Sequence, residues 1–166
     1  MKKFFLTLML FVFNFSAAAY DNVTSSCDLM YRAAECLKKK DYKGVKYYTQ
    51  KCISLYKAQA LQMSRKLKDF APFETANLYW ALNDVAYAYY LQGEMYRELG
   101  KYELARRKYE MVLKKFKYAQ VYDPAIGGDW KVAEECKKKL ELIKGKLNKS
   151  KNNKFIKKEL RPLKIQ

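Results

Sequence analysis

The residues of this chain best suited to acid–base chemistry are carboxylates in segments with a helical pattern. Glu94 and Glu98 are four residues apart, so a helix would place both on one face. Arg97 and Lys101 stand beside them, and ordinary surface ion pairing explains this group better than a catalytic pair. The remaining candidates are Asp84, Glu103, Glu134 and Glu135. The chain contains no histidine, which is the commonest general base and the commonest metal ligand.

The cysteines are the other candidates for chemistry: Cys27, Cys36, Cys52 and Cys136. Cysteine catalysis normally needs a histidine partner, and the chain has neither a C-x-x-C pair nor the spacing of a zinc, calcium or phosphate loop. We therefore expect a protein that is not an enzyme and that uses no metal or cofactor. Four cysteines allow three full pairings. A disulfide between Cys36 and Cys52 is possible if a hairpin brings them together; the alternative is that both pack as small apolar side chains.

The first 19 residues have the pattern of a secretory signal peptide. Lys2 and Lys3 precede an uncharged apolar run over residues 4–15, and the small residues 16–19 then supply an A-x-A cleavage site. The run is too short for an ordinary membrane-spanning helix, although an uncleaved N-terminal anchor is the alternative. We expect an exported protein, periplasmic or secreted, in which disulfides can persist.

The net charge of +17 is spread unevenly. Residues 137–166 hold 12 Lys/Arg against 2 Asp/Glu, whereas residues 20–136 hold 20 against 15. Residues 149–166 are rich in Lys and Asn, and we expect a basic, disordered tail there. Such a tail indicates an anionic partner or surface. The alternative is a solvated end that keeps the protein soluble.

Apolar spacing along the chain predicts five helices and no strand. The expected helices cover residues 27–40, 45–68, 73–99 and 102–117, and a last helix capped by Asp129 has an apolar seam from Ala133 to Leu147. Turns are expected at residues 41–44 and at Gly100, and a loop at residues 123–128. A helical hairpin cannot bury its apolar face alone, so these helices must stack.

Residues 86–117 carry the most specific pattern in the chain. Gly93 and Ala105 are small residues at an expected helix crossing, and Gly100 and Tyr102 form a Gly-x-Tyr turn. Large side chains recur at fixed offsets around them: Tyr89, Tyr96, Tyr109 and Val112. This segment resembles a tetratricopeptide repeat, a helical hairpin that usually holds other proteins. The departures from the pattern are Gln92, where Leu is usual, and Lys117, where Pro is usual.

The resemblance extends more weakly to the rest of the chain. In the first expected hairpin the matching positions are Leu29, Ala33, Tyr42, Val45 and Cys52. Residues 118–124 and 130–133 look like the segment that closes the array in a group of exported bacterial tetratricopeptide proteins, where Trp130 would cover the open end of the stack. The resemblance implies an all-α domain over residues 20–148, built of stacked helical hairpins with a C-terminal capping helix. It also implies a non-catalytic scaffold or adaptor of the bacterial cell envelope.

The resemblance also implies a binding face, because the family presents its ligand-facing side chains on the inner face of each first helix. In the second hairpin these positions are Tyr87, Tyr90, Glu94, Arg97 and Glu98. In the first hairpin they are Cys27, Met30, Ala34, Leu37 and Lys38. Tyrosine-rich surfaces suit peptide ligands; the alternative is that the tyrosines pack against flanking helices. Tyr90 and Glu94 stand where carboxylate-gripping members have Lys and Asn, so such a clamp is not expected.

The basic tail supports a second hypothesis for function. Its cations alternate with a few apolar residues, as in segments that bind anionic membrane leaflets or polysaccharides. The expected contacts are Lys151, Lys154, Lys157, Lys158 and Arg161. Export argues against nucleic acid as the partner. The first hypothesis, a protein or peptide held by the helical domain, and this tethering hypothesis both remain open on the sequence, as does the oligomeric state.

Overall fold

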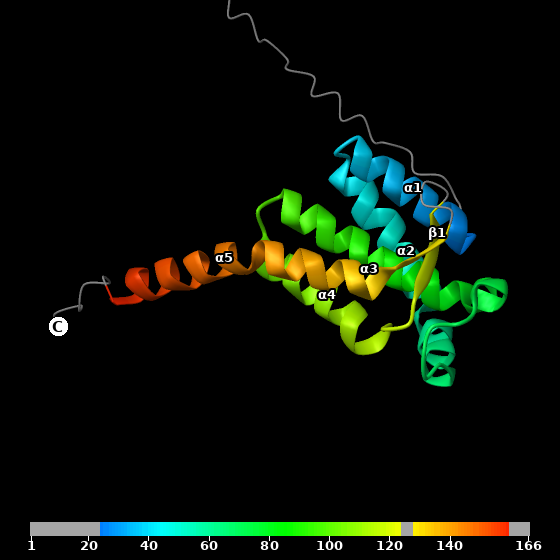
Figure 1. Cartoon of the computed structure of the whole chain (residues 1–166). Helices are drawn as coiled ribbons and strands as arrows, with labels where there is room; N and C mark the ends of the chain where they lie inside the picture. Colours follow the sequence, from blue (N-terminus) through cyan, green and yellow to red (C-terminus); the bar gives the residue numbers. More distant parts are fainter. Residues whose placement is uncertain (1–23, 124–127, 160–166) are drawn as a thin grey trace, which may run out of the picture.

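The computed structural model describes residues 24–123 and 128–159, with side chains described over residues 24–122 and 130–148. Five α-helices pack against one another in chain order (Figure 1). They are α1 (Ser26–Lys38), α2 (Tyr42–Lys66), α3 (Trp80–Glu98), α4 (Tyr102–Lys115) and α5 (Val132–Glu159). The all-α prediction is confirmed for the described residues apart from one short hairpin of strands. The predicted signal peptide, residues 1–19, lies outside them.

The two tight helix–helix turns have the same backbone geometry. After α3, Gly100 adopts φ +68°, its N–H donates to the carbonyl of Arg97, and the N–H of Lys101 donates to that of Tyr96. These two bonds form a Schellman motif, which satisfies carbonyls that the helix end leaves free. The end of α1 repeats the motif with Lys40 at φ 57°. The predicted stop at Gly100 is therefore confirmed, whereas no glycine marks the end of α1.

The turn between α1 and α2 is shorter than predicted. Asp41 caps α2 with its side chain, which accepts the N–H of Gly44 at 3.0 Å. The helix consequently begins at Tyr42 rather than after Gly44, and it continues without interruption to Lys66. A short polar side chain at this position satisfies one of the unpaired N–H groups of the first turn.

The core runs through all five helices. Its fully buried side chains include Leu29 of α1, Cys52 of α2, Leu82 of α3, Tyr109 of α4 and Cys136 of α5. The predicted seam of α5 is confirmed, because its members are buried or half-buried against this core: Ala133, Cys136, Leu140, Ile143 and Leu147. The helices therefore bury their apolar stripes against each other rather than against a sheet.

The prediction of no strand is wrong. Strand β1 (Gln120–Asp123) pairs antiparallel with β2 (Gly128–Lys131), which places Val121 opposite Trp130. The hairpin is fixed to the helices through Gln120: its backbone N–H donates to Oδ1 of Asn83 at 2.9 Å, and its side-chain amide donates to the carbonyl of Ala71 at 2.8 Å. Asp129 lies in β2 and does not cap the last helix, which begins at Val132.

Two further segments differ from the prediction. Residues Phe73–Tyr79 form a 3₁₀ helix, η1, instead of the first turns of one long α-helix, and Pro72 directly precedes it. At the other end of the chain, α5 continues as helix through Glu159, past the expected start of the tail at residue 149, and projects from the helical body (Figure 1). Residues 160–166 lie outside the described residues. In the described part of the chain, no helix has the length and apolar character needed to cross a membrane.

Candidate functional site

Three aromatic side chains from α3 and β2 contact one another on the predicted binding face. Tyr87 and Tyr90, one turn apart on α3, stack with ring centroids 6.1 Å apart and planes 11° apart. Trp130 of β2 meets both rings edge-on, with centroids 5.9 Å from Tyr87 and 4.9 Å from Tyr90. All three are half-buried. Edge-to-face contacts of this kind stabilise the arrangement beyond the apolar area that they bury.

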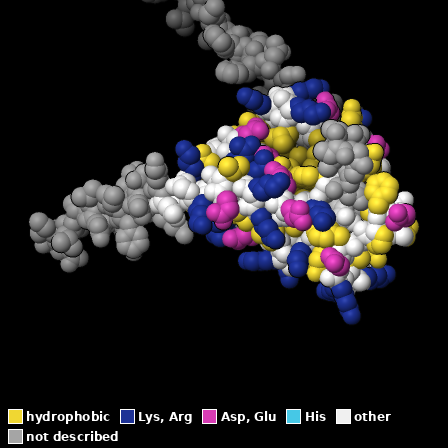
Figure 2. All heavy atoms as spheres, in the orientation of Figure 1, with side chains coloured by type: hydrophobic (Ala, Val, Ile, Leu, Met, Phe, Trp, Pro, Cys, Tyr) yellow, Lys and Arg dark blue, Asp and Glu magenta, His cyan; other side chains and the backbone are white. Residues whose placement is uncertain are grey.

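The aromatic group borders an apolar area of the surface. Figure 2 shows hydrophobic side chains gathered between α1 and the first half of α5. On the α1 side, Ala34 and Leu37 are half-buried and pack against the core, while Met30 is buried. Among the positions that the family resemblance assigned on α1 and α3, five have aliphatic or aromatic side chains: Met30, Ala34, Leu37, Tyr87 and Tyr90.

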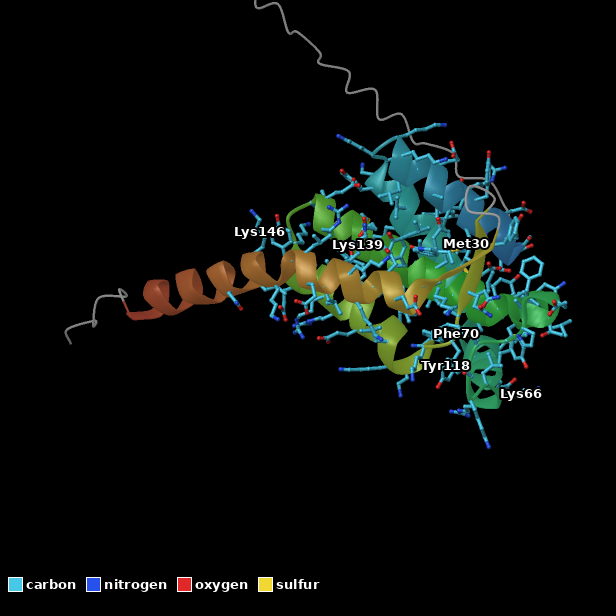
Figure 3. All side chains as sticks on the ribbon, in the orientation of Figure 1. Met30, Lys66, Phe70, Tyr118, Lys139 and Lys146 are labelled. Carbon is cyan, nitrogen blue, oxygen red and sulfur yellow. The ribbon has the colours of Figure 1, made fainter. Side chains whose placement is uncertain are left out.

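Glu94 lies within a buried polar network rather than on this surface. Its side chain is buried, with 6% of the residue exposed. One oxygen accepts the hydroxyl of the fully buried Tyr109 at 2.5 Å and Nε of Arg97 at 3.1 Å. The other oxygen accepts Nη2 of Arg97 at 2.7 Å and lies 3.7 Å from Nζ of Lys139 of α5. The network thus joins α3, α4 and α5 (Figure 3 labels Lys139).

Electrostatics explains why this carboxylate stays ionised. Burial alone would raise the pKa of Glu94, but the hydrogen bonds from Arg97 and Tyr109 and the positive charges of Arg97 and Lys139 outweigh burial and hold its pKa below the usual value. Burial, together with the bond to Glu94, raises the pKa of Tyr109. Because both oxygens of Glu94 already accept hydrogen bonds, this carboxylate is poorly placed to act as a base.

The predicted partner-binding residues therefore divide into two groups. Tyr87, Tyr90 and the partly exposed Arg97 lie on or beside the surface. The predicted ion pair of Glu94 with Arg97 is confirmed, but Glu94 is buried and does not lie on the surface as expected. Glu98 accepts the hydroxyl of Tyr42 at 3.1 Å, which links the second hairpin to the start of α2.

A second carboxylate, Asp84 of α3, lies at the contact with α1, and no cation of the described residues forms an ion pair with it. The hydroxyl of Ser26 donates to Oδ2 of Asp84 at 2.5 Å. Burial raises the pKa of Asp84, and the Ser26 hydrogen bond opposes that rise only in part. The sequence marked Asp84 as a candidate acid, but nothing in the sequence pairs it with Ser26, which lies 58 residues earlier.

Replacing Asp84 with asparagine should stabilise the protein near neutral pH. The folded-state pKa of Asp84 is raised, so its charged form is penalised on folding; the penalty is absent below the unfolded-state pKa, about 3.9, and complete above the folded value. The amide keeps an acceptor for Ser26 and carries no charge, so we expect a gain on the order of 1 kcal/mol at pH 7 and none in acid. Thermal melts of both proteins at pH 3 and pH 7 would measure it; an equal effect at the two pH values would contradict the assignment.

All four cysteines are free, and the possible bridge between Cys36 and Cys52 is not formed. The sulfur of Cys36 packs against Gly44 at the start of α2. Cys52 lies in the core, where burial, with a smaller effect of Asp84, raises its thiol pKa to about 12. Burial also raises the thiol pKa of Cys136. These two thiols behave as packed apolar groups and not as nucleophiles.

The residues predicted to bind an anionic surface lie where the structure describes no side chains. Lys151, Lys154, Lys157 and Lys158 belong to the last part of α5, where only the backbone is described, and Arg161 lies outside the described residues.

Comparison of this chain with family models, with curated proteins and with solved structures finds no match.

Proposed function

We propose that this chain is a non-catalytic scaffold or adaptor that binds a protein or peptide. The supporting observation is the aromatic group of Tyr87, Tyr90 and Trp130, which is held rigid by ring contacts on a partly apolar surface. Rigid aromatic side chains contribute contact area at little cost in conformational entropy, and such residues dominate binding energy at protein interfaces.

The fold supports the proposal through its likeness to tetratricopeptide hairpins. The α1–α2 and α3–α4 pairs are antiparallel hairpins with tight Schellman turns, the second pair crosses at Gly93 beneath Tyr109, and α5 covers α4. We infer that these are stacked repeats of this kind, closed by α5, and that the protein works in the bacterial cell envelope after export. Direct contacts would come from Tyr87, Tyr90 and Arg97, whereas Glu94 would hold the helices behind them.

The aromatic surface can be tested by photo-cross-linking in cells. A photoreactive phenylalanine analogue at Tyr87 should capture a discrete partner protein, because this ring lies at the edge of the proposed contact. The same analogue at Leu142 of α5, where the residue is 71% exposed, serves as the control and should capture no such species. Adding Trp130→Ala should remove the Tyr87 product while the purified variant stays folded. Identical products from both positions, or none from Tyr87, would refute the proposed surface.

The tethering hypothesis is distinguished by a deletion. If the basic C-terminal segment holds the protein on an anionic membrane leaflet or polysaccharide, then removing residues 149–166 should release it from envelope fractions without changing the Tyr87 cross-link. If the aromatic surface carries function, the same deletion leaves partner capture intact, and loss of the cross-link on deletion would count against that surface.

A further inference from the structure

Helix α2 is unusual in its charge. Its 25 residues include no Asp or Glu, and its cations are Lys43, Lys46, Lys51, Lys57, Arg65 and Lys66. Lys46 and Lys57 share one stripe of the helix with uncharged residues, because positions 46, 50, 53, 57, 61 and 64 recur at spacings of three and four. A surface helix normally mixes both signs of charge, so a helix whose charged side chains are all cations indicates an anionic partner.

This face borders a groove of about 420 Å³ between α2 and α4. The rim consists of exposed cations, Lys57 and Arg65 on α2 with Lys114 and Lys115 on α4. Leu61 and Met111 are half-buried within the groove and give it an apolar floor. Its size lies in the range of about 300–1,000 Å³ that is usual for ligand-binding pockets.

The two helices are fixed to each other at the end of the groove. The hydroxyl of Ser64 donates to the carbonyl of Lys115 at 2.7 Å, so the C-terminal ends of α2 and α4 lie together. Figure 3 labels Lys66 and Tyr118, which mark this end of the molecule. The groove is therefore bounded by two rigid elements and is present before any ligand binds.

The positive charge in the groove is largely unneutralised. Among the described residues, no carboxylate forms an ion pair with Lys57, Arg65 or Lys115, and Lys114 has only a 3.8 Å contact with Glu110. Lys108 adds to the cluster: it is half-buried, its ammonium lies 5.5 Å from the ring centre of Tyr89, and burial together with the charge of Lys57 lowers its pKa.

Helix dipoles account for only part of this pattern. Arg65, Lys114 and Lys115 stand in the last turns of their helices, where cations are favoured by the negative end of the dipole. Lys57 and Lys108 lie about two turns earlier, where that effect has faded. Among the described residues no carboxylate pairs with either lysine, so an anion in the groove would relieve their mutual repulsion.

The basic surface continues along α2 beyond the groove. Lys43, Lys46 and Lys51 surround the half-buried ring of Tyr47, and the ammonium of Lys51 lies 5.8 Å from the centre of that ring. From residue 43 to residue 65 the helix rises by about 33 Å, the length of roughly ten residues of extended chain.

We propose that the groove between α2 and α4, with the basic face of α2, binds an acidic segment of a partner protein. Its carboxylates would pair with Lys57, Arg65 and Lys115, and its apolar side chains would contact Leu61 and Met111. A peptide fits this surface better than a bilayer does, because the apolar groups lie between two helices below the cationic rim, where a flat membrane surface would meet the rim alone. The groove shares no residue with the aromatic surface of α3 and β2, so either of the two proposed binding sites can be disproved without affecting the other.

The test uses a fluorescent 12-residue peptide of alternating Glu and Leu, titrated with the full chain and followed by anisotropy. We expect saturable binding that weakens with salt, and the triple variant K57Q/R65Q/K115Q should bind about tenfold more weakly. The matched control is K101Q/K137Q/K146Q, which removes the same charge from exposed lysines outside the groove. It should bind within about twofold of the unaltered chain. A Leu61→Ser variant that thermal melting shows to be folded should also bind the peptide more weakly.

Three outcomes would overturn the proposal. Equal weakening in both triple variants would mean that net charge alone attracts the peptide. Vesicles of mixed anionic and zwitterionic lipid that bind more tightly than the peptide, and lose binding in the groove variant, would make the surface a membrane contact. If no saturable binding of the peptide is seen at low salt, the groove does not bind an acidic segment.

Discussion

Replacing Gly93 with leucine should leave the chain unable to fold, and alanine should lower the free energy of unfolding by about 1–3 kcal/mol. A Cβ atom at Gly93 would lie 2.7 Å from Cδ1 and 2.8 Å from Cζ of Tyr109, distances that side chains do not tolerate. The Tyr109 ring cannot move aside, because it is fully buried, its hydroxyl is bonded to Glu94, and Tyr90 packs beside it. Thermal and urea unfolding would measure both effects.

Gly145 supplies the matched control. It also lies within a helix, but a Cβ there would meet no atom within 4 Å. Since alanine favours the helix over glycine by up to about 1 kcal/mol, Gly145→Ala should leave stability unchanged or raise it. If Gly93→Ala stabilised the protein as Gly145→Ala does, the close crossing of α3 and α4 would be wrong.

Replacing Glu94 with alanine should destabilise the protein by about 3–5 kcal/mol, because it leaves Arg97 without its buried counter-charge, whereas Lys139 keeps its contact with Glu135. The Tyr109 hydroxyl would lose its acceptor in the core as well. The control is Glu141→Gln, which removes an exposed i,i+3 contact with Lys144 and should change stability by less than about 0.5 kcal/mol. Equal effects of the two substitutions would contradict the buried network.

The pH dependence of stability gives an independent measure of the same carboxylate. The folded-state pKa of Glu94 is lowered, so its stabilising contribution is complete above the pKa of an unfolded glutamate, about 4.3, and is lost as pH falls through the folded value. The unaltered chain should therefore lose stability in acid more steeply than Glu94→Gln. Asp84, whose pKa is raised, works in the opposite direction, so the comparison is best made in the Asp84→Asn background.

The helices could be predicted because their apolar stripes repeat at helical spacing, and the stop at Gly100 because only glycine adopts its conformation without strain. The strand hairpin was missed for a physical reason. Each strand has four residues, and the inward position of β1 is occupied by Gln120, whose burial depends on Asn83 and Ala71. A buried polar residue in so short a segment leaves no alternation of apolar and polar side chains.

The burial of Glu94 could not be predicted from the sequence, whereas the neighbourhood of three aromatic side chains was partly expected. Tyr87 and Tyr90 were expected on the binding face, and Trp130 was expected to cover the stack; the structure places all three together. Glu94 was assigned to the same face because the family resemblance implied that its position faces the ligand. Its burial depends on Tyr109 and Lys139, which come from other helices, and helical spacing within α3 contains no information about them.

The order in which the helices pack has a consequence for folding kinetics. Each helix contacts the next one along the chain, so contact order is low and the protein should fold quickly, without waiting for distant segments to meet. Helix α3 contacts α1, α2, α4 and α5, whereas α1 has neighbours only among α2 and α3 in the main packing. Amide hydrogen exchange should accordingly be slowest in α3. During synthesis, the α1–α2 hairpin would be complete before α3, which covers it in the folded protein, has been made. At that stage the apolar face of the hairpin would be exposed, and a chaperone would be needed.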